Sequence, residues 1–248
     1  MATEFLPELD ITAPARQRRW TVLLRWLLLV PQFIVMWALG IATAVVAVIS
    51  WFAALFLGRL PDWSIAYLSG YLGYYHRVAA YALLLVDTYP PFSWSSGDHP
   101  VSVRLAPGRL NRLAVLFRIV LVIPAAIVLD LISTGLATLV FFFWLIMLVI
   151  GRTPVPVFGA TAATLRYTLR VQAYFLLLSS SYPKGLFGEP HQVNRAGAVG
   201  SDTRPLVLSS GGRVLLIVFI VLGVLGSFGG GDGAEQANSG NNQVRSTY

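Results

Sequence analysis

Two sets of aromatic and basic side chains recur in the sequence with the spacing of one helical face. In each set an arginine comes three residues after one tyrosine and four before another, which puts the three side chains on the same side of a helix. The two sets are Tyr74, Arg77 and Tyr81, and Tyr167, Arg170 and Tyr174. Guanidinium and phenol groups on one face suit the headgroup layer of a membrane. We therefore predict contact with anionic lipid headgroups; a simple interfacial anchor is the alternative.

Four more arginines lie at the ends of long apolar segments and are the other candidates for headgroup contact. Arg25 and Arg118 lie just inside the start of these segments, where a side chain either binds an anionic headgroup or extends to the membrane surface. Arg59 and Arg152 each follow an apolar segment in the motif Gly-Arg-x-Pro. The proline stops the helix, and the glycine allows close approach of backbone or headgroup. We predict two related anionic-lipid sites, one in each half of the chain.

Residues that could perform catalysis or bind a metal are sparse. His76, His99 and His191 lack ligand spacing, cysteine is absent, and no GxSxG, HExxH or phosphate-loop motif occurs. Asp130 is the one carboxylate between the ends of the long apolar segments, and it begins the stretch "DLISTG", which is typical of a turn. The sequence therefore predicts no enzymatic activity, no cofactor and no metal site.

The composition indicates the surroundings of these side chains. Hydrophobic residues make up 56% of the 248 positions and charged residues only 12%, whereas soluble domains carry about 25% charge. Together with a mean hydropathy of +0.69, this is typical of an integral membrane protein. The net charge of +7 comes largely from arginines that flank apolar segments. We attribute it to membrane orientation and expect no nucleic-acid partner.

Three apolar segments are long enough to be considered as membrane spans. They are 20–57, 113–150 and 214–225, the last extended upstream by 206–208. A crossing helix needs roughly 20 residues, and the first two segments are about twice that length. We predict that each of these two forms a tight transmembrane hairpin, with turns near Gly40 and within 130–135. The third segment predicts a single span.

The sequence contains an internal duplication. Glycine, arginine, proline, tryptophan and tyrosine residues match at a constant offset of 93 positions, as Gly58 does with Gly151 and Trp51 with Trp144. Matches of these residue types are informative, whereas apolar matches are expected between any two membrane segments. The predicted organisation is unit one at 4–96, unit two at 97–189, a linker and C-terminal transmembrane helix at 190–228, and a disordered tail at 229–248.

Each unit has the same predicted parts. Short segments with alternating apolar residues precede the spans, and we predict that 7–12, 101–105 and 206–208 pair into a small cytosolic β-sheet. A tyrosine-rich amphipathic helix follows each hairpin, at about 64–86 and 158–178. If this helix lies on the membrane surface, nearly all arginines stay on the cytosolic side, whereas a crossing helix moves several of them outside. We favour the surface position.

The predicted fold is thus an all-α integral membrane protein with five spans. Two tandem repeats each contribute a transmembrane helical hairpin and an interfacial amphipathic helix, and the C-terminal span is additional. The distribution of arginines places the N-terminus in the cytosol and the C-terminal tail outside the plasma membrane.

The sequence also resembles a known family. The stretches "RLNRLAVLFRIVLVIP", "HRVAAYALLLVDTYPPF" and "PVSVRL" are similar to an uncharacterised family of bacterial, largely actinobacterial, multi-pass membrane proteins, known as domain of unknown function 4389. The likeness extends over most of the chain up to about Arg213 and the last span. It implies an integral membrane protein and brings no catalytic residue or activity with it.

Two functions remain open on this basis. The first is a non-enzymatic plasma-membrane protein that serves as a scaffold or accessory subunit and contacts anionic lipid headgroups. The second is a transporter or channel for a small solute or ion, because tandem repeats are common in such proteins. The expected partners are anionic membrane lipids together with another membrane protein or a second copy of the chain.

Overall fold

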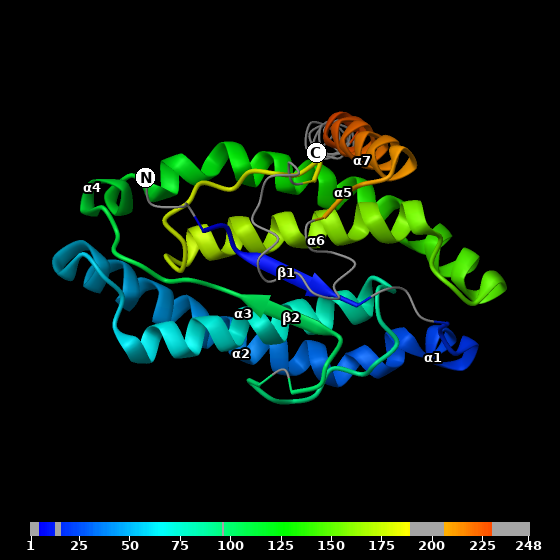
Figure 1. The fold of residues 1–248 in the computed structure, drawn as a ribbon, viewed down its shortest axis with the longest axis horizontal. Helices are drawn as coiled ribbons and strands as arrows, with labels where there is room; N and C mark the ends of the chain where they lie inside the picture. Colours follow the sequence, from blue (N-terminus) through cyan, green and yellow to red (C-terminus); the bar gives the residue numbers. More distant parts are fainter. Residues whose placement is uncertain (1–4, 13–15, 96, 189–205, 230–248) are drawn as a thin grey trace, which may run out of the picture.

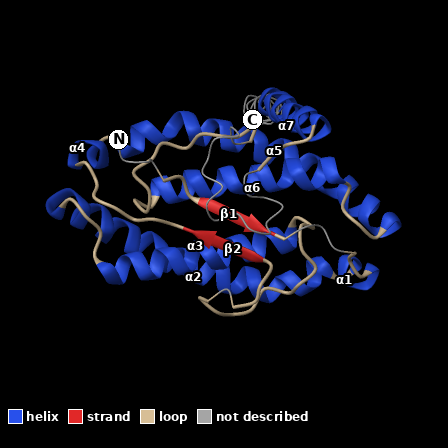
Figure 2. Ribbon diagram, in the orientation of Figure 1, coloured by secondary structure: helices blue, strands red, loops and turns tan. Residues whose placement is uncertain are grey.

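The computed structural model describes residues 5–12, 16–95, 97–188 and 206–229, and it consists of helices and one small sheet (Figures 1 and 2). The elements in chain order are β1 (Glu8–Ile11), α1 (Arg19–Leu23), α2 (Arg25–Leu57), α3 (Asp62–Ala82), β2 (Val101–Arg104), α4 (Arg112–Leu116), α5 (Arg118–Ile150), α6 (Val155–Phe175) and α7 (Ser210–Gly229). Each element from β1 to α3 reappears 93 residues later with the same length. The predicted tail beyond Gly229, and most of the predicted linker, lie outside the described residues.

The predicted transmembrane hairpins are wrong, because each long apolar segment forms one continuous helix. Both α2 and α5 have 33 residues, which corresponds to about 50 Å at 1.5 Å per residue. Gly40 lies inside α2, and the stretch 130–135 lies inside α5. The hydroxyl of Thr138 bonds to the carbonyl of Thr134 one turn earlier, at 2.9 Å. Polar side chains satisfied in this way do not need a turn.

The hairpin of each unit lies instead between the apolar helix and the tyrosine-rich helix. Gly58 ends α2 in the left-handed conformation, with φ of 70°, and its N–H bonds to the carbonyl of Ala54. Pro61 then provides the extended residue that precedes α3. The hydroxyls of Ser50 and Ser64, 2.6 Å apart, show that α3 folds back along α2. The motif Gly-Arg-x-Pro is therefore a helix-to-helix connection, and Gly151 repeats the conformation with φ of 73°.

The tyrosine-rich helices form the centre of the molecule and not its membrane-facing surface. In α6, 14 of the 21 residues are buried. Helix α3 packs against α6, while α2 packs on α3 and α5 packs on α6 from the outside. The structure thus buries the two helices that we expected at the membrane interface.

Within the described residues, three helices, and not the five predicted spans, are long and apolar enough to cross a membrane. They are α2, α5 and residues 210–228 of α7. The four polar residues of α2, Arg25, Gln32, Thr43 and Ser50, are all buried, so this helix exposes only apolar residues and glycine. Polar side chains turned inward and apolar ones outward are the pattern of a helix surrounded by lipid. The coarser prediction of a multi-pass membrane protein is therefore supported.

The sheet predicted from the two leading segments is present. Strands β1 and β2 are antiparallel, with Glu8 opposite Arg104 and Ile11 opposite Val101. Leu9, Ile11 and Val101 face the helices and are buried, so the alternate positions face outward. The segment 206–208, the predicted third strand, is not a strand; Leu206 and Leu208 pack into the hydrophobic core around α6.

The two units contact each other through reciprocal interactions. The indole of Trp51 on α2 donates to the carbonyl of Val115 at 3.1 Å, and its counterpart Trp144 on α5 donates to Val22 at 2.8 Å. Such self-complementary contacts are those of a two-fold axis. The later part of α2 therefore lies beside α4, which directly precedes α5, and the later part of α5 lies beside α1, which directly precedes α2. The two long helices thus run antiparallel (Figure 1).

Helix α7 adds to the second unit. It packs on α5 and α6, with very close approach to α5. A Cβ atom on Gly135 would lie 1.9 Å from the carbonyl oxygen of Phe219, and one on Gly223 would lie 2.0 Å from that of Leu131. Glycine at both positions permits backbone contact between the helices, as in other membrane helix pairs.

Candidate functional site

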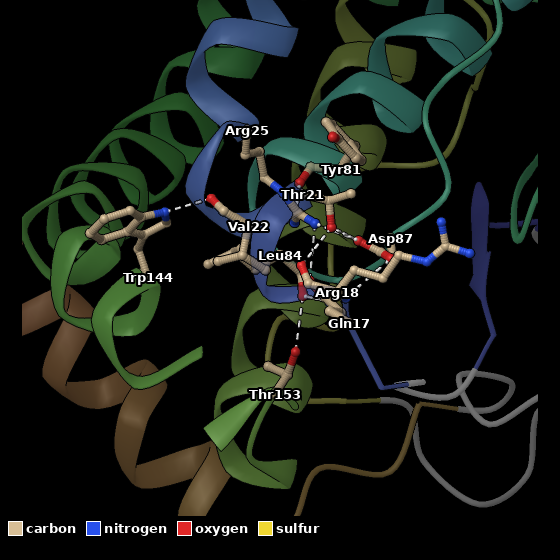
Figure 3. A network of polar contacts seen from close by, with 10 residues as sticks. All are labelled: Gln17, Arg18, Thr21, Val22, Arg25, Tyr81, Leu84, Asp87, Trp144 and Thr153. Atoms are coloured by element: carbon tan, nitrogen blue, oxygen red, sulfur yellow. Dashed lines mark hydrogen bonds and ion pairs between the residues drawn. The ribbon is translucent and has the colours of Figure 1, made fainter. Parts of the chain in front are cut away.

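Arg25 is the centre of a buried polar network in the first unit (Figure 3). Only 1% of this residue is exposed. Its guanidinium donates to the carbonyl of Tyr81 at 2.8 Å, to the side-chain oxygen of Gln17 at 3.0 Å and to the carboxylate of Asp87 at 3.2 Å. It also lies 4.4 Å from the centre of the Tyr81 ring. The positive charge is thus paired with Asp87, and the two terminal nitrogens of the guanidinium have three acceptors.

The partners of Arg25 are themselves held by further hydrogen bonds. The hydroxyl of Thr21 donates to Asp87 at 2.6 Å. The amide of Gln17 donates to the carbonyl of Leu84 at 2.7 Å, and the hydroxyl of Thr153 from the second unit donates to the same carbonyl at 2.9 Å. Leu84 has a positive φ of 63°, a conformation that costs a branched residue free energy and persists only where its surroundings fix it. The network therefore ties the first unit to the second.

Arg118, the counterpart of Arg25 in the second unit, has lost most of this support. It is 4% exposed, donates to the carbonyl of Ser179 and lies 4.1 Å from the centre of the Tyr174 ring. At the offset of 93, the polar partners Gln17, Thr21, Asp87 and Thr153 become Leu110, Ala114, Ser180 and Leu60. Among the described residues, no carboxylate forms an ion pair with Arg118.

Arg77 and Arg170, the arginines of the two Tyr-Arg-Tyr sets, are also inside the protein. Arg77 is 2% exposed and donates to the carbonyl of Ser93. Burial lowers the pKa of Arg77 from its ordinary value, and Tyr74 opposes this effect. Arg170 donates to the carbonyl of Pro7 at 3.3 Å and to that of Lys184 at 2.7 Å. Both side chains fasten chain segments onto the central helices.

The tyrosines of the two sets divide between different partners. The ring of Tyr74 lies near Arg77, at 5.9 Å, whereas Tyr81 stacks on Arg25. The hydroxyl of Tyr74 donates to Gln32, and that of Tyr167 to the carbonyl of Ala125. Desolvation raises the pKa of Tyr74 and Tyr167, which keeps both phenols neutral. The residues of a set thus share a helical face but do not form a single cluster with common partners.

Arg59 and Arg152 are exposed, and each lies beside the basic segment of the other unit. The N–H of Gln17 bonds to the carbonyl of Gly151, and the N–H of Leu110 to that of Gly58, both at 3.0 Å. These contacts create two basic ends, each with exposed arginines from both units. The first basic end has Arg16, Arg18, Arg19 and Arg152, and the second has Arg59, Arg109 and Arg112. The sequence predicted two basic sites, each built from the arginines of a single unit. The exposed arginines instead gather at two opposite ends of the molecule, and each end combines residues of both units.

Several buried polar residues were missed by reasoning from the sequence. His76 is completely buried, and desolvation lowers its pKa to about 4. Arg166 is 3% exposed and donates to the carbonyl of Leu9 at 3.2 Å. Gln32 and Asp87 could have been found from the repeat itself, because each is a polar residue that breaks a position of the duplication. No three His, Asp or Glu side chains of the described ranges form a group that could hold a metal ion.

Comparison with known proteins agrees with this duplicated architecture. The model of the family described as "Domain of unknown function (DUF4389)" matches residues 19–93 and again residues 112–186. The chain belongs to this family. The two DUF4389 matches begin at α1 and α4, and each extends beyond the tyrosine-rich helix, which confirms the resemblance and the tandem repeat. No curated protein and no solved structure matches the chain significantly.

Proposed function

We propose that this DUF4389 protein is a non-enzymatic integral protein of the plasma membrane, acting as a scaffold or accessory subunit that contacts anionic lipid headgroups. The observation that carries this proposal is the position of the polar sheet face. Glu8, Asp10, Ser102 and Arg104 lie on the outward side of β1 and β2, which pack against the central helices midway along the apolar helices (Figure 1).

This position has a consequence if α2 and α5 cross the bilayer. The sheet then lies at the depth of the hydrocarbon core, where lipid cannot solvate the exposed charge of Arg104. Another protein surface must cover it. A second copy of the chain or another membrane protein meets this need, which supports an accessory role.

The basic ends support contact with anionic lipid. Antiparallel spans place the first basic end on one side of the membrane and the second on the other. Arg213, at the start of α7, lies near the first end, because Gly211 contacts Pro156 at the start of α6. More arginines then lie at the first end, which favours a cytosolic N-terminus and an external tail. Each exposed arginine near an anionic surface contributes about 1 kcal/mol.

The second candidate is a transporter or channel. The antiparallel relation of the two units favours it, because inverted repeats are a common transporter design. In that case the polar sheet face borders a water-filled path and not a partner. The unbroken α2 and α5 count against it, since transporter sites are typically built from interrupted helices.

Cysteine labelling separates these possibilities, because the chain has no cysteine. Asp62→Cys and Val155→Cys are equivalent positions at opposite ends. A membrane-impermeant maleimide should label Asp62→Cys on intact cells and Val155→Cys only after lysis. Labelling of both from the same side would refute the crossing topology.

Ser102→Cys tests the sheet face in the same membranes. Protection in native membranes, followed by labelling after detergent purification, is expected for an accessory subunit. Equal labelling in membranes would favour a water-filled path and hence transport.

Lipid contact is tested by native mass spectrometry of Arg59→Gln combined with Arg152→Gln. We expect fewer bound phosphatidylglycerol molecules than in the wild type. Arg104→Gln, an exposed arginine away from both basic ends, is the matched control and should retain them. Equal lipid binding by all three proteins would refute headgroup contact at the basic ends.

A further inference from the structure

A pocket of about 380 Å³ lies beside Arg118, between the second half of α2 and the start of α5. Its walls are formed by apolar and aromatic side chains, among them Val48, Trp51, Phe52 and Ile119. Arg118 is the one charged residue among the described residues of this lining. The volume falls within the range of small-molecule sites, about 300–1,000 Å³.

The charge of Arg118 has no partner of opposite sign among the described residues. Only 4% of this residue is exposed. Its hydrogen bond goes to a neutral carbonyl, that of Ser179. A buried charge without a counter-charge is strongly unfavourable, whereas pairing it with an anion removes the penalty.

The duplication shows what is missing. In the first unit Arg25 pairs with the carboxylate of Asp87 at 3.2 Å. The equivalent of Asp87 in the second unit is Ser180, whose hydroxyl cannot supply a negative charge. The same arginine position is thus neutralised by a carboxylate in one unit. In the other unit it borders an apolar pocket whose described lining residues include no acid.

We propose that the Arg118 pocket binds a single-chain anionic amphiphile. The carboxylate or phosphate of the ligand pairs with the guanidinium of Arg118. It takes the role that the carboxylate of Asp87 has beside Arg25 in the first unit. The hydrocarbon chain of the ligand lies along the walls that include Trp51 and Phe52. Since Arg25 is already paired, one ligand binds to each protein chain. This inference rests on the proposed function, because both involve an anionic lipid-like ligand. The pocket is, however, separate from the exposed basic ends.

The test uses the full-length protein in neutral detergent, titrated with palmitate and followed by native mass spectrometry. Ser180→Asp supplies the missing carboxylate from within the protein, so it should weaken palmitate binding at least about tenfold and raise the unfolding temperature. Ser180→Asn has a similar size without the charge and should bind like the wild type. Arg118→Gln should also weaken binding about tenfold. If Ser180→Asp binds palmitate as tightly as Ser180→Asn, the proposal is wrong, whether or not Arg118→Gln folds.

Further probes identify the ligand source and the role of the chain. Palmitate binding tighter than that of lysophosphatidylglycerol assigns a free fatty acid, and the reverse order assigns a membrane lipid. Three results would overturn the proposal: the protein binds neither ligand, it binds neutral methyl palmitate as tightly as palmitate, or inorganic phosphate at a similar concentration displaces palmitate. This test is independent of the one for the proposed function. Arg59→Gln with Arg152→Gln tests phosphatidylglycerol contact at the basic ends, whereas Ser180→Asp leaves those two arginines unchanged and tests the pocket alone.

Discussion

Replacing Asp87 by asparagine tests whether the buried ion pair with Arg25 stabilises the fold. Asparagine keeps the size and a hydrogen-bond acceptor but removes the charge. Breaking a fully buried pair costs about 3–5 kcal/mol because it leaves an unpaired charge. The side chain of Asp87 is 21% exposed, and Arg25 keeps its bonds to Tyr81 and Gln17. We therefore expect a loss of about 2 kcal/mol in the free energy of unfolding.

The assay is thermal unfolding in neutral detergent, followed by tryptophan fluorescence at a single scan rate, since membrane proteins often unfold irreversibly. For a chain of this size the expected decrease in the unfolding temperature is about 4–8 °C. Ser180→Asn introduces the same side chain at the equivalent position of the second unit, where the structure describes no ion pair with Arg118. It should change the unfolding temperature by less than about 2 °C. Equal temperatures for Asp87→Asn and Ser180→Asn would refute the assigned role of the pair.

Three further perturbations test other parts of the structure. Gly135→Ala should lower the free energy of unfolding by about 1–3 kcal/mol, because the added Cβ meets the backbone of α7. Gly40→Ala makes only an ordinary contact and should not lower it; similar effects from both variants would contradict the close packing. Gly58→Ala should cost about 1 kcal/mol because of its positive φ, while Gly108→Ala, which meets no neighbour, should be neutral. His76→Leu should reduce the acid sensitivity of the fold, because the pKa of His76, about 4 when folded, lies below its unfolded value of about 6.5. Wild-type stability is therefore complete above about pH 6.5 and declines by up to roughly 3 kcal/mol as the pH falls to 4; parallel unfolding curves for wild type and variant would contradict this.

Composition and spacing were sufficient for much of the architecture. The offset that joins Gly58 to Gly151 predicted the duplication, and alternation in the two leading segments predicted β1 and β2. The error concerned the long apolar segments, where length alone favoured a turn at Gly40. A glycine within an apolar helix does not break it when hydrogen bonds and packing continue on either side, and the sequence alone does not reveal that packing.

The sequence indicated Arg25 and Tyr81 as candidate headgroup contacts, but it predicted neither their arrangement nor their partners Gln17, Thr21 and Asp87. The spacing of Tyr74, Arg77 and Tyr81 placed them on one face, yet Tyr81 packs on Arg25, which lies on another helix. The sequence could not show this, because the partners of a buried arginine are distant in the chain: Asp87 is 62 positions from Arg25. Differences between equivalent positions, such as Asp87 and Ser180, were the more informative signal.

The reciprocal contacts between the two units also determine when the first unit can be completed during synthesis. The carbonyl of Val22 accepts a hydrogen bond from the indole of Trp144, and that of Leu84 accepts one from the hydroxyl of Thr153. Both donors are synthesised after the first unit. Until the ribosome has made α5 and the start of α6, the first unit therefore lacks the contacts of Trp144 and Thr153. Folding of the first half is therefore coupled to translation of the second. A ribosome that stalls between the units would leave a half-protein with its two-fold surface uncovered, which a second such half could complete.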